Sequence, residues 1–415
     1  MFSGPPNPRQ SVCYTQGVTL VSYALVGLML LGTVGWLALF VYNIWKIREA
    51  PRLKPSGAFG FPSDAPLVSV LVPARNEASR ILDRAVKSIA AQDYPNVEVV
   101  VVDDRSTDGT WELVKRLAEE HPRVQAVRGA PLPTGWAGKV WALEQAKRKA
   151  AGAWIVATDA DIVFEPEAVR AAMSVAFRGR FDAVTLLPEI GAGTFWTRVV
   201  MPIAEWMIAI VLPIDKTNDP KSDVALGCGG FFLMRREAHD AVGGYEAISG
   251  EVIDDVATAR AFKAGRRRLR IEAGQQLLFT PMYETLGELW HGFSKNAFAG
   301  AGNSVAVVAR NVSANLLATA LPMALTVAGL LLWLVFGIAE ARLVALSAVA
   351  AYVAMVVAFL PVYGALGGRW YLAPLAGFGN VVMVAILVNS AWKALSGKGV
   401  VWRGQRTQLV TDRRS

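Results

Sequence analysis

The stretch IVATDADIVF, residues 155–164, joins an apolar, β-branched run to two aspartates that stand one residue apart. The run indicates a buried strand, where an unpaired carboxylate is expensive. Asp159 and Asp161 therefore need a cation, a strand end that opens to water, or both. Because alternate strand residues point the same way, the pair can direct two carboxylates at one hard divalent cation. The structural alternative is that Asp161 caps the next helix.

Short apolar strands and amphipathic helices alternate on both sides of this stretch. LVSVLVPA (67–74) and VEVVVVDD (97–104) are nearly continuous apolar runs, as is typical of parallel strands covered by helices on both faces. The pattern predicts an α/β fold with a doubly wound, Rossmann-like sheet, whose ligands bind beyond the carboxyl ends of the strands. Further strands are expected over 123–129, 153–161 and 181–187, and helices over 77–92, 107–121, 138–152 and 165–179.

Polar residues follow three of these strands, in the segments VPARNE, VVDDRSTDGT and TDADIVFEP. They are expected at one edge of the sheet, in the ligand crevice. Asp103 and Asp104 suit hydrogen bonds from a base or a ribose, although the same segment has the composition of a turn, with Asp108 as a helix cap. PLPTGWAGKVWALEQA places Lys139 at a helix start, where it either meets a phosphate or is simply solvated.

A further acidic pair, Asp254 and Asp255, stands at the start of a predicted helix in SGEVIDDVATARAFKAG. One of the two carboxylates can act as a general base for a hydroxyl. The structural alternative is the favourable placement of acidic residues at a helix N-terminus.

Part of the 415-residue chain is expected to lie in lipid, because 53% of its residues are hydrophobic. Charge-free runs cover residues 10–45, 311–339, 343–368 and 370–392, and each is long enough to span a bilayer as a helix. The first run is longer than a signal-peptide core and is interpreted as a retained anchor.

Basic residues determine the expected orientation. They follow the first apolar run at Lys46, Arg48, Arg52 and Lys54, so the middle of the chain is expected in the cytoplasm and the protein in the cell (inner) membrane. Three later spans would place the C-terminus outside, yet residues 393–415 are also basic. Either one late run is re-entrant, or the charges of the anchor outweigh those of the tail.

The net charge of +8 is explained by these membrane-flanking clusters rather than by nucleic-acid binding, for which no motif is present. The aromatic segment 195–213 is expected to be either a core helix or an interfacial helix. The expected organisation is an N-terminal anchor (1–45), a basic Pro/Gly linker (46–66), a catalytic domain (67–310), transmembrane helices (311–392) and a basic tail (393–415).

Taken in order, VSVLVPARNEASRILDRAVKSIAAQDYPNVEVVVVDDRSTDGT, GWAGKVWAL, TDAD, GGFFLMRREAHDAVGGYE and IDDVATA resemble a family 2 glycosyltransferase with the GT-A fold, from roughly Val68 to Gly300. Within that family the chain is most similar to membrane enzymes associated with hopanoid and carotenoid glycosylation, and more distantly to ceramide glucosyltransferases. The resemblance implies a nucleotide-diphosphate sugar as donor, foremost a UDP-sugar, with Mg²⁺ or Mn²⁺ and inversion at the anomeric carbon.

The resemblance also implies roles for single residues. Asp159 and Asp161 match the metal and diphosphate motif, and Asp255 matches the base, while Asp254 stands where the family normally has Glu. Lys139 would lie near the nucleoside or the diphosphate. LWHGFSKNAF replaces the Gln/Arg-x-x-Arg-Trp motif of processive relatives, which argues against a cellulose- or hyaluronan-type synthase. The nucleoside pocket would be lined by Pro73, Arg75, Glu77, Asp103 and Asp104.

Three functions remain compatible with the sequence. The first is transfer of a sugar to a hydroxyl of a membrane lipid of the terpenoid, carotenoid, hopanoid or glycerolipid type. The second is transfer to a polyprenyl phosphate, which is already ionised and needs no base. The third is a non-catalytic membrane scaffold or transporter, against which the intact Asp103, Asp159, Asp161 and Asp255 argue.

Overall fold

The computed structural model describes residues 8–53, 60–191, 193–366, 369–396, 400–402 and 405–407. Part of the basic linker, including Lys54, and most of the basic tail lie outside the described residues.

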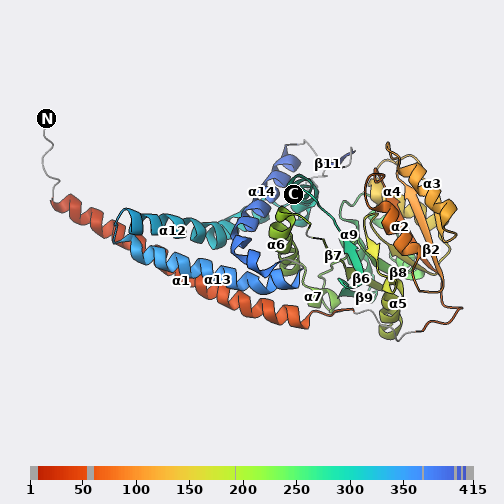
Figure 1. Cartoon of the computed structure of the whole chain (residues 1–415), viewed down its shortest axis with the longest axis horizontal. Coiled ribbons are helices and arrows are strands. Elements are labelled where there is room, and N and C mark those ends of the chain that lie inside the picture. The colour runs from red at the N-terminus through yellow and green to blue at the C-terminus, as the bar shows by residue number, and fades with distance from the viewer. Residues whose placement is uncertain are drawn as a thin grey trace.

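A seven-stranded mixed sheet, in the order β3-β2-β1-β4-β8-β6-β9, forms the centre of one end of the molecule (Figure 1). The sequence-predicted strands are confirmed. Only β8 runs against its neighbours, pairing antiparallel with both β4 and β6. The strands are β1 (Val68–Ala74), β2 (Val97–Asp103), β3 (Val124–Arg128), β4 (Trp154–Ala157), β6 (Ala183–Leu187), β8 (Phe232–Arg235) and β9 (Leu269–Ala273).

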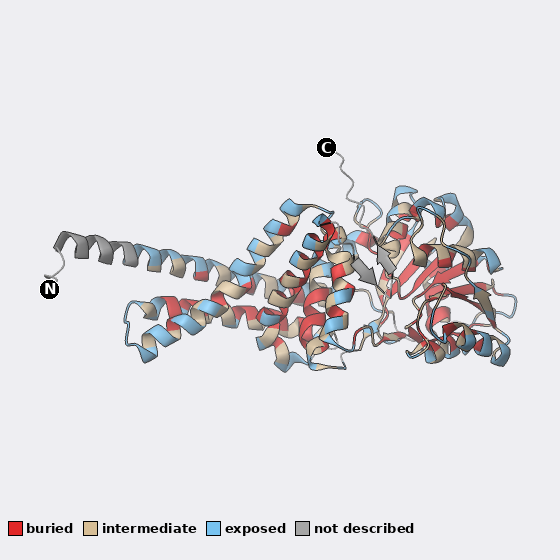
Figure 2. Ribbon diagram, turned by 90° about the horizontal axis from the view of Figure 1, so that it is seen from above, coloured by how far each residue is buried: buried red, intermediate tan, exposed pale blue. Residues whose placement is uncertain are grey.

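Helices cover both faces of this sheet, which confirms the α/β, doubly wound class. In β1, Val70 and Val72 face one buried cluster, whereas Leu71 faces the other, as the two-residue period of a strand requires. Figure 2 shows the strands buried between exposed helix surfaces. The first face carries α2 (Leu82–Ala90), α3 (Thr110–Glu120) and α5 (Ala168–Gly179), and the second carries α4 (Gly138–Lys149), α8 (Arg236–Ala241) and α9 (Asp254–Ala264).

A second, three-stranded sheet lies at the carboxyl edge of the first, in the order β5-β10-β7. Its strands are β5 (Val163–Phe164), β7 (Glu189–Ile190) and β10 (Leu278–Thr280). Because β4 ends at Ala157 and β5 begins at Val163, the aspartates of the TDAD motif lie in the turn between the two sheets.

Four helical stretches in the described part of the chain are long and apolar enough to cross a membrane: Thr19–Glu49, Val305–Val335, Ala341–Ala365 and Trp370–Leu395. They coincide with the four apolar runs of the sequence. Figure 1 shows α1, α12 and α13 extending together away from the sheet. The elements are α1 (Pro8–Glu49), α11 (Val305–Asn315), π-helical η2 (Leu316–Ala320), α12 (Leu321–Leu330), π-helical η3 (Leu331–Val335), α13 (Ala341–Ala365), η4 (Trp370–Leu375) and α14 (Ala376–Leu395).

Two helices, α6 (Phe195–Val211) and α10 (Leu286–Gly300), pack against α14. The Tyr363 hydroxyl of α13 donates a 2.7 Å hydrogen bond to the carbonyl of Val199 in α6. At Gly379 of α14 an added Cβ would lie 2.9 Å from the same carbonyl, so the two backbones meet closely. Helix α6 is therefore packed against the apolar helices on one side. This packing is compatible both with a core helix and with an interfacial helix, the two expectations for this segment.

The end of α1 is attached to the edge of the main sheet. The N–H of Leu53 donates to the Ala273 carbonyl of β9, and the N–H of Ala273 donates to the Pro51 carbonyl, both at 2.9 Å. Lys46 forms a 2.7 Å ion pair with Asp215. These contacts fix the apolar helix relative to the strand ends. The remaining elements are α7 (Ile214–Asn218), η1 (Glu246–Ile248), β11 (Val400–Trp402) and β12 (Gln405–Thr407).

Candidate active site

One cavity of about 2070 Å³ lies at the carboxyl ends of the strands and collects nearly all of the residues singled out from the sequence. It arises because β1 and β4 run parallel, so that the segments that follow them leave the sheet at the same edge. Asp103 does not line the cavity and is buried instead, with 2% of its surface exposed. The predicted residues that line it are Pro73, Arg75, Glu77, Asp104, Lys139, Asp159, Asp161, Asp254 and Asp255.

Lys139 joins the acidic groups to one another. Its Nζ lies 2.8 Å from Oδ1 of Asp159 and 3.1 Å from Oδ2 of Asp254. Burial opposes the charge of Lys139, but the surrounding carboxylates outweigh that effect and hold its pKa well above the usual value. The side chain is therefore a cation that an incoming diphosphate can share, and the prediction of a simply solvated lysine is wrong.

Asp254 and Asp255, adjacent in sequence, have different partners. Asp254 pairs with Lys139, whereas Asp255 accepts 2.8 Å hydrogen bonds from the backbone N–H groups of Gly229 and Val256. Burial, followed by the charge of Asp254, raises the pKa of Asp255 to about 6. A carboxylate that is positioned by backbone amides and titrates near neutral pH suits a general base. This difference separates two residues that the sequence pattern alone leaves equivalent.

Gly229 lies so close to the acidic cluster that an added Cβ would force neighbouring side chains to move. A Cβ at this position would lie 2.9 Å from Nζ of Lys139 and 3.1 Å from Oδ2 of Asp159. The Gly-rich stretch GCGG is therefore part of the site, a role that its sequence alone does not separate from that of an ordinary loop.

Asp161 does not serve as a helix cap. Helix α5 begins at Ala168, and its N-cap residue is Glu167, without a side-chain capping bond, so the structural alternative for Asp161 is wrong. Burial and the neighbouring Asp159 raise the pKa of Asp161 to about 6, while Arg80 opposes the shift. Within the described residues its carboxylate forms no ion pair.

A divalent cation fits this pair of aspartates only with help from a substrate. The part of the chain that the structure describes contains no group of three or more His, Cys, Asp or Glu side chains arranged to hold a metal. Mg²⁺ commonly binds one or two carboxylates together with substrate phosphates. Asp161 and Asp159 supply the carboxylates, and a diphosphate would supply the remaining oxygens.

The other end of the cavity has hydrogen-bonding groups that suit a nucleoside. Arg75 donates a 2.8 Å hydrogen bond to the Asp104 carbonyl, and Arg105 lies 2.7 Å from Oδ1 of Asp104. Oδ1 of Asp103 is buried and has no hydrogen-bond partner among the described residues. Asp108 accepts from the backbone N–H groups of Thr110 and Ala78 and therefore holds the loop, as the turn interpretation predicts. It is not the cap of α3, because the N-cap residue of that helix is Gly109.

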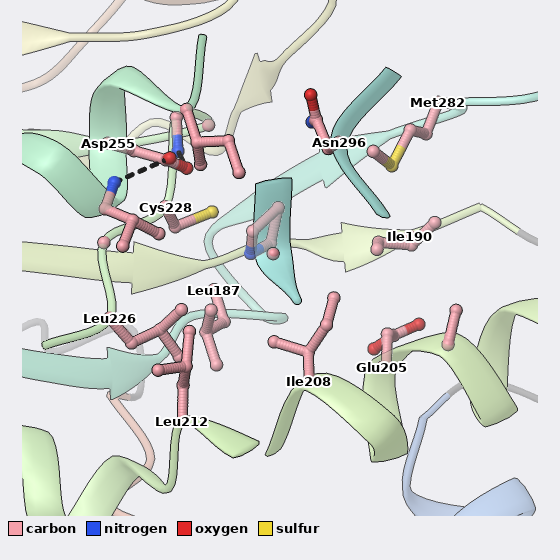
Figure 3. Close-up of a pocket in the computed structure, with 18 of the residues that line it drawn as sticks. Leu187, Ile190, Glu205, Ile208, Leu212, Leu226, Cys228, Asp255, Met282 and Asn296 are labelled. Atoms are coloured by element: carbon pink, nitrogen blue, oxygen red, sulfur yellow. Dashed lines mark hydrogen bonds between the residues drawn. The ribbon is translucent and has the colours of Figure 1, made fainter. Parts of the chain in front are cut away.

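The cavity continues beyond the carboxylates to the apolar helices. Its wall includes Ile208 of α6, Val362 and Leu366 of α13, and Met383 and Leu387 of α14. Figure 3 shows Asp255 and Ile208 lining the same pocket. The acidic cluster and these apolar side chains thus line one and the same cavity.

Sequence reasoning missed several ionisable groups in this cavity, among them Glu205 of α6. Burial alone raises the pKa of its carboxyl to about 8. The signal was available as a lone acidic residue within a 17-residue apolar helix.

Comparison with known proteins finds a family match over part of the chain. Residues 69–243 match the family model for glycosyl transferase family 2. A beta-monoglucosyldiacylglycerol synthase from a Nostoc species is 29% identical over 246 residues, which are 57% of this chain and 49% of that protein. A dolichol-phosphate mannosyltransferase from Pyrococcus furiosus is 29% identical over 179 residues, 42% of this chain and 48% of that protein. The chain thus spans about half the length of the curated relatives it matches.

Among solved structures, a mannosyltransferase from Pyrobaculum calidifontis in complex with GDP-Man and Mn²⁺ is similar in fold. It shares 21% sequence identity, with a TM-score of 0.48, and the match covers 91% of this chain and 99% of that one.

Proposed function

Since residues 69–243 form a glycosyl transferase family 2 domain with the GT-A fold, we propose that the protein transfers a sugar, with inversion, from a nucleotide-diphosphate sugar to a hydroxyl of a membrane lipid. The observation that carries the proposal is the single cavity, which joins the acidic residues at the strand ends to the apolar wall of α6, α13 and α14. Such a space brings a water-soluble donor and a lipid acceptor to one reaction centre.

The donor would occupy the polar end of the cavity. Asp104 and Arg75 are suited to the nucleoside, with Pro73 and Glu77 completing its pocket, whereas Asp103 is buried and does not line the cavity. Lys139 stands at the start of α4, where its charge and the free backbone N–H groups of the helix would bind the diphosphate. We propose a UDP-sugar as the donor.

Asp159 and Asp161 would hold Mg²⁺ or Mn²⁺ together with the diphosphate. When bound, such an ion offsets the negative charge that develops on the leaving group. Lys139, which already contacts Asp159, places a second positive charge beside the same group.

Asp255 would remove the proton of the acceptor hydroxyl as its oxygen attacks the anomeric carbon. The bond from that carbon to the diphosphate breaks on the opposite face, so the configuration inverts and the nucleoside diphosphate leaves. The amides of Gly229 and Val256 hold the Asp255 carboxylate in position, and Asp254 keeps Lys139 nearby.

The acceptor would enter from the membrane side. The names of the relatives offer two kinds of acceptor: a diacylglycerol, which carries a hydroxyl, and a dolichol phosphate, which carries a phosphate. The positioned Asp255 favours a hydroxyl, because a phosphate needs no base. A polyprenyl phosphate is the second candidate, and terpenoid, hopanoid or carotenoid alcohols belong to the first class.

The four apolar helices support placement in a membrane, and we propose the cell (inner) membrane with the catalytic domain in the cytoplasm. Lys46, at the end of α1 nearest the sheet, lies 4.7 Å from the centre of the Trp45 ring. An aromatic ring and a lysine at this position are typical of a membrane interface, and basic residues favour its cytoplasmic side. The domain boundaries given above are part of this proposal.

Transfer by the detergent-purified protein tests the function. A panel of UDP- and GDP-sugars is supplied with Mg²⁺ or Mn²⁺, and with diacylglycerol, polyprenyl phosphate or total membrane lipid. Mass spectrometry of a new glycolipid identifies the sugar and the acceptor together. Asp161→Ala and Asp255→Asn should both lose the product. No metal-dependent transfer from any donor would refute the proposal.

A further inference from the structure

The wall of the cavity includes carboxyl groups that the proposed mechanism does not use, and one of them belongs to an otherwise apolar stretch of helix. This group belongs to Glu205 of α6, and Figure 3 shows it extending from the helix into the pocket. The residues labelled around it in that figure are mostly apolar, among them Ile190, Ile208, Leu212 and Met282. The side-chain carboxyl of Glu205 forms no hydrogen bond and no ion pair with the described residues.

A carboxyl group in such surroundings costs free energy unless a partner satisfies it. A residue needed only for packing at this point of α6 would be apolar, as the lining residues Ala204 and Ile208 are. The position is therefore better explained by a polar group that arrives with a ligand.

A second unsatisfied polar group lines the same cavity from a different helix. Oδ1 of Asn296, in α10, is buried and has no hydrogen-bond partner in the described part of the structure. Helices α6 and α10 thus each contribute to this cavity a polar group that has no hydrogen-bond partner among the described residues. Two such groups can hold a small headgroup between them while the lipid chains contact the apolar wall.

We propose that Glu205 and Asn296 bind the uncharged, hydroxyl-bearing headgroup of the acceptor lipid, and that Glu205 excludes lipid phosphates. The inference rests on the proposed function and names its acceptor class. A hydroxyl can donate to and accept from a carboxyl and an amide, so it satisfies both side chains.

The charge around Glu205 supports exclusion of a phosphate. An ionised carboxylate repels an anion, and a protonated one offers only a single O–H to it. Lys295 of α10 also lines the cavity. The charged groups that act on it are Lys139 and the aspartates of the acidic cluster, so we group Lys295 with that cluster and not with Glu205. Burial raises the pKa of the Glu205 carboxyl to about 8, and no lysine or arginine of the described residues forms an ion pair with it.

The test compares Glu205→Leu, which removes the polar group, with Glu205→Gln, which keeps the shape and the hydrogen-bonding capacity. Glu49→Leu is the matched control, because Glu49 is an exposed carboxylate on the wall of the same cavity. Binding of UDP, measured by calorimetry, reports whether each variant keeps an intact domain.

Two readouts are used with the full-length protein in detergent. The first is the KM for dioctanoylglycerol in the transfer assay, which should rise about tenfold or more in Glu205→Leu, as expected from one lost hydrogen bond. It should change less than threefold or so in Glu205→Gln and Glu49→Leu. The second is the rise in Tm on adding dioctanoylglycerol without a donor, which should be lost in Glu205→Leu alone.

A short-chain polyprenyl phosphate tests whether Glu205 disfavours a lipid phosphate. It should raise the Tm of the wild-type protein less than dioctanoylglycerol does. In Glu205→Leu the two lipids should differ less in the rise in Tm that they cause. The inference would be overturned if dioctanoylglycerol gave the same KM and the same rise in Tm with wild type and Glu205→Leu. It would also be overturned if the polyprenyl phosphate raised the Tm of wild type more than dioctanoylglycerol does. A wild-type protein that binds dioctanoylglycerol through Glu205 but transfers no sugar would instead refute the proposed function alone.

Discussion

The backbone N–H of Gly229 donates a 2.8 Å hydrogen bond to Oδ2 of Asp255, although the two residues belong to different segments of the chain. An added Cβ at Gly229 would lie 2.9 Å from Nζ of Lys139, so any other residue here would displace the end of that side chain. One residue without a side chain thus allows the lysine, Asp159 and Asp255 to gather at one point.

Gly229→Ala should therefore reduce kcat/KM for transfer by about tenfold or more, because the added methyl group displaces Lys139 and weakens the alignment of Asp255. Steady-state kinetics checks this. Gly109→Ala is the control, since its Cβ would make only an ordinary 3.7 Å contact with Ala78. Equal activity of the two variants would contradict the role given to Gly229.

Asp255→Asn should lower the rate of transfer to a lipid hydroxyl by roughly 10²–10⁴-fold, the usual contribution of a general base. Binding of UDP should persist, because the nucleoside groups lie elsewhere in the cavity. Parallel assays with diacylglycerol and polyprenyl phosphate measure the effect. Retained transfer to the phosphate alone would identify it as the natural acceptor.

The rate should depend on pH through Asp255, whose pKa is raised to about 6. A base acts only when deprotonated, so kcat/KM should fall about tenfold per unit as the pH decreases below that value. Burial is the main cause of the shift, and Asp254 contributes further. Asp254→Asn should therefore move the acidic limb of the profile to lower pH, whereas an unchanged limb would mean that another group is titrating.

Removal of divalent cations with a chelator should abolish transfer, and Mn²⁺ or Mg²⁺ should restore it, because the two aspartates of the turn need a cation beside an anionic diphosphate. Asp161→Asn should raise the concentration of Mn²⁺ that gives half-maximal activity. Titration of activity against Mn²⁺ measures this shift. Full activity in the chelator would exclude a metal-dependent mechanism.

The contact between α6 and α14 provides a test that does not involve the reaction. Gly379→Ala should lower the Tm, because a Cβ there would lie 2.9 Å from the Val199 carbonyl, and overpacking of this kind costs about 1–3 kcal/mol. Gly364→Ala on α13 has no atom within 4 Å of its Cβ and should leave the Tm unchanged or raise it. Thermal unfolding in detergent compares the two.

Local pattern determined the elements of this protein. The apolar runs of β1, β2 and β4, the helical periodicity between them and the four long charge-free stretches are properties of consecutive residues, so the strands, helices and candidate membrane spans could be predicted. The aspartates that follow Ala157 could be assigned to the ligand edge of the sheet for the same reason.

Tertiary structure alone decided which groups meet. The reversed direction of β8, the partners that distinguish Asp254 from Asp255, the approach of Gly229 to Lys139, and the entry of Glu205 into the cavity all join residues far apart in the chain. Periodicity indicates which face of an element is apolar, but it carries no information about the element that will cover that face. Local pattern therefore assigns the acidic residues to one edge of the sheet, whereas the contacts among them, and the way α6 and α10 line the cavity, depend on tertiary packing.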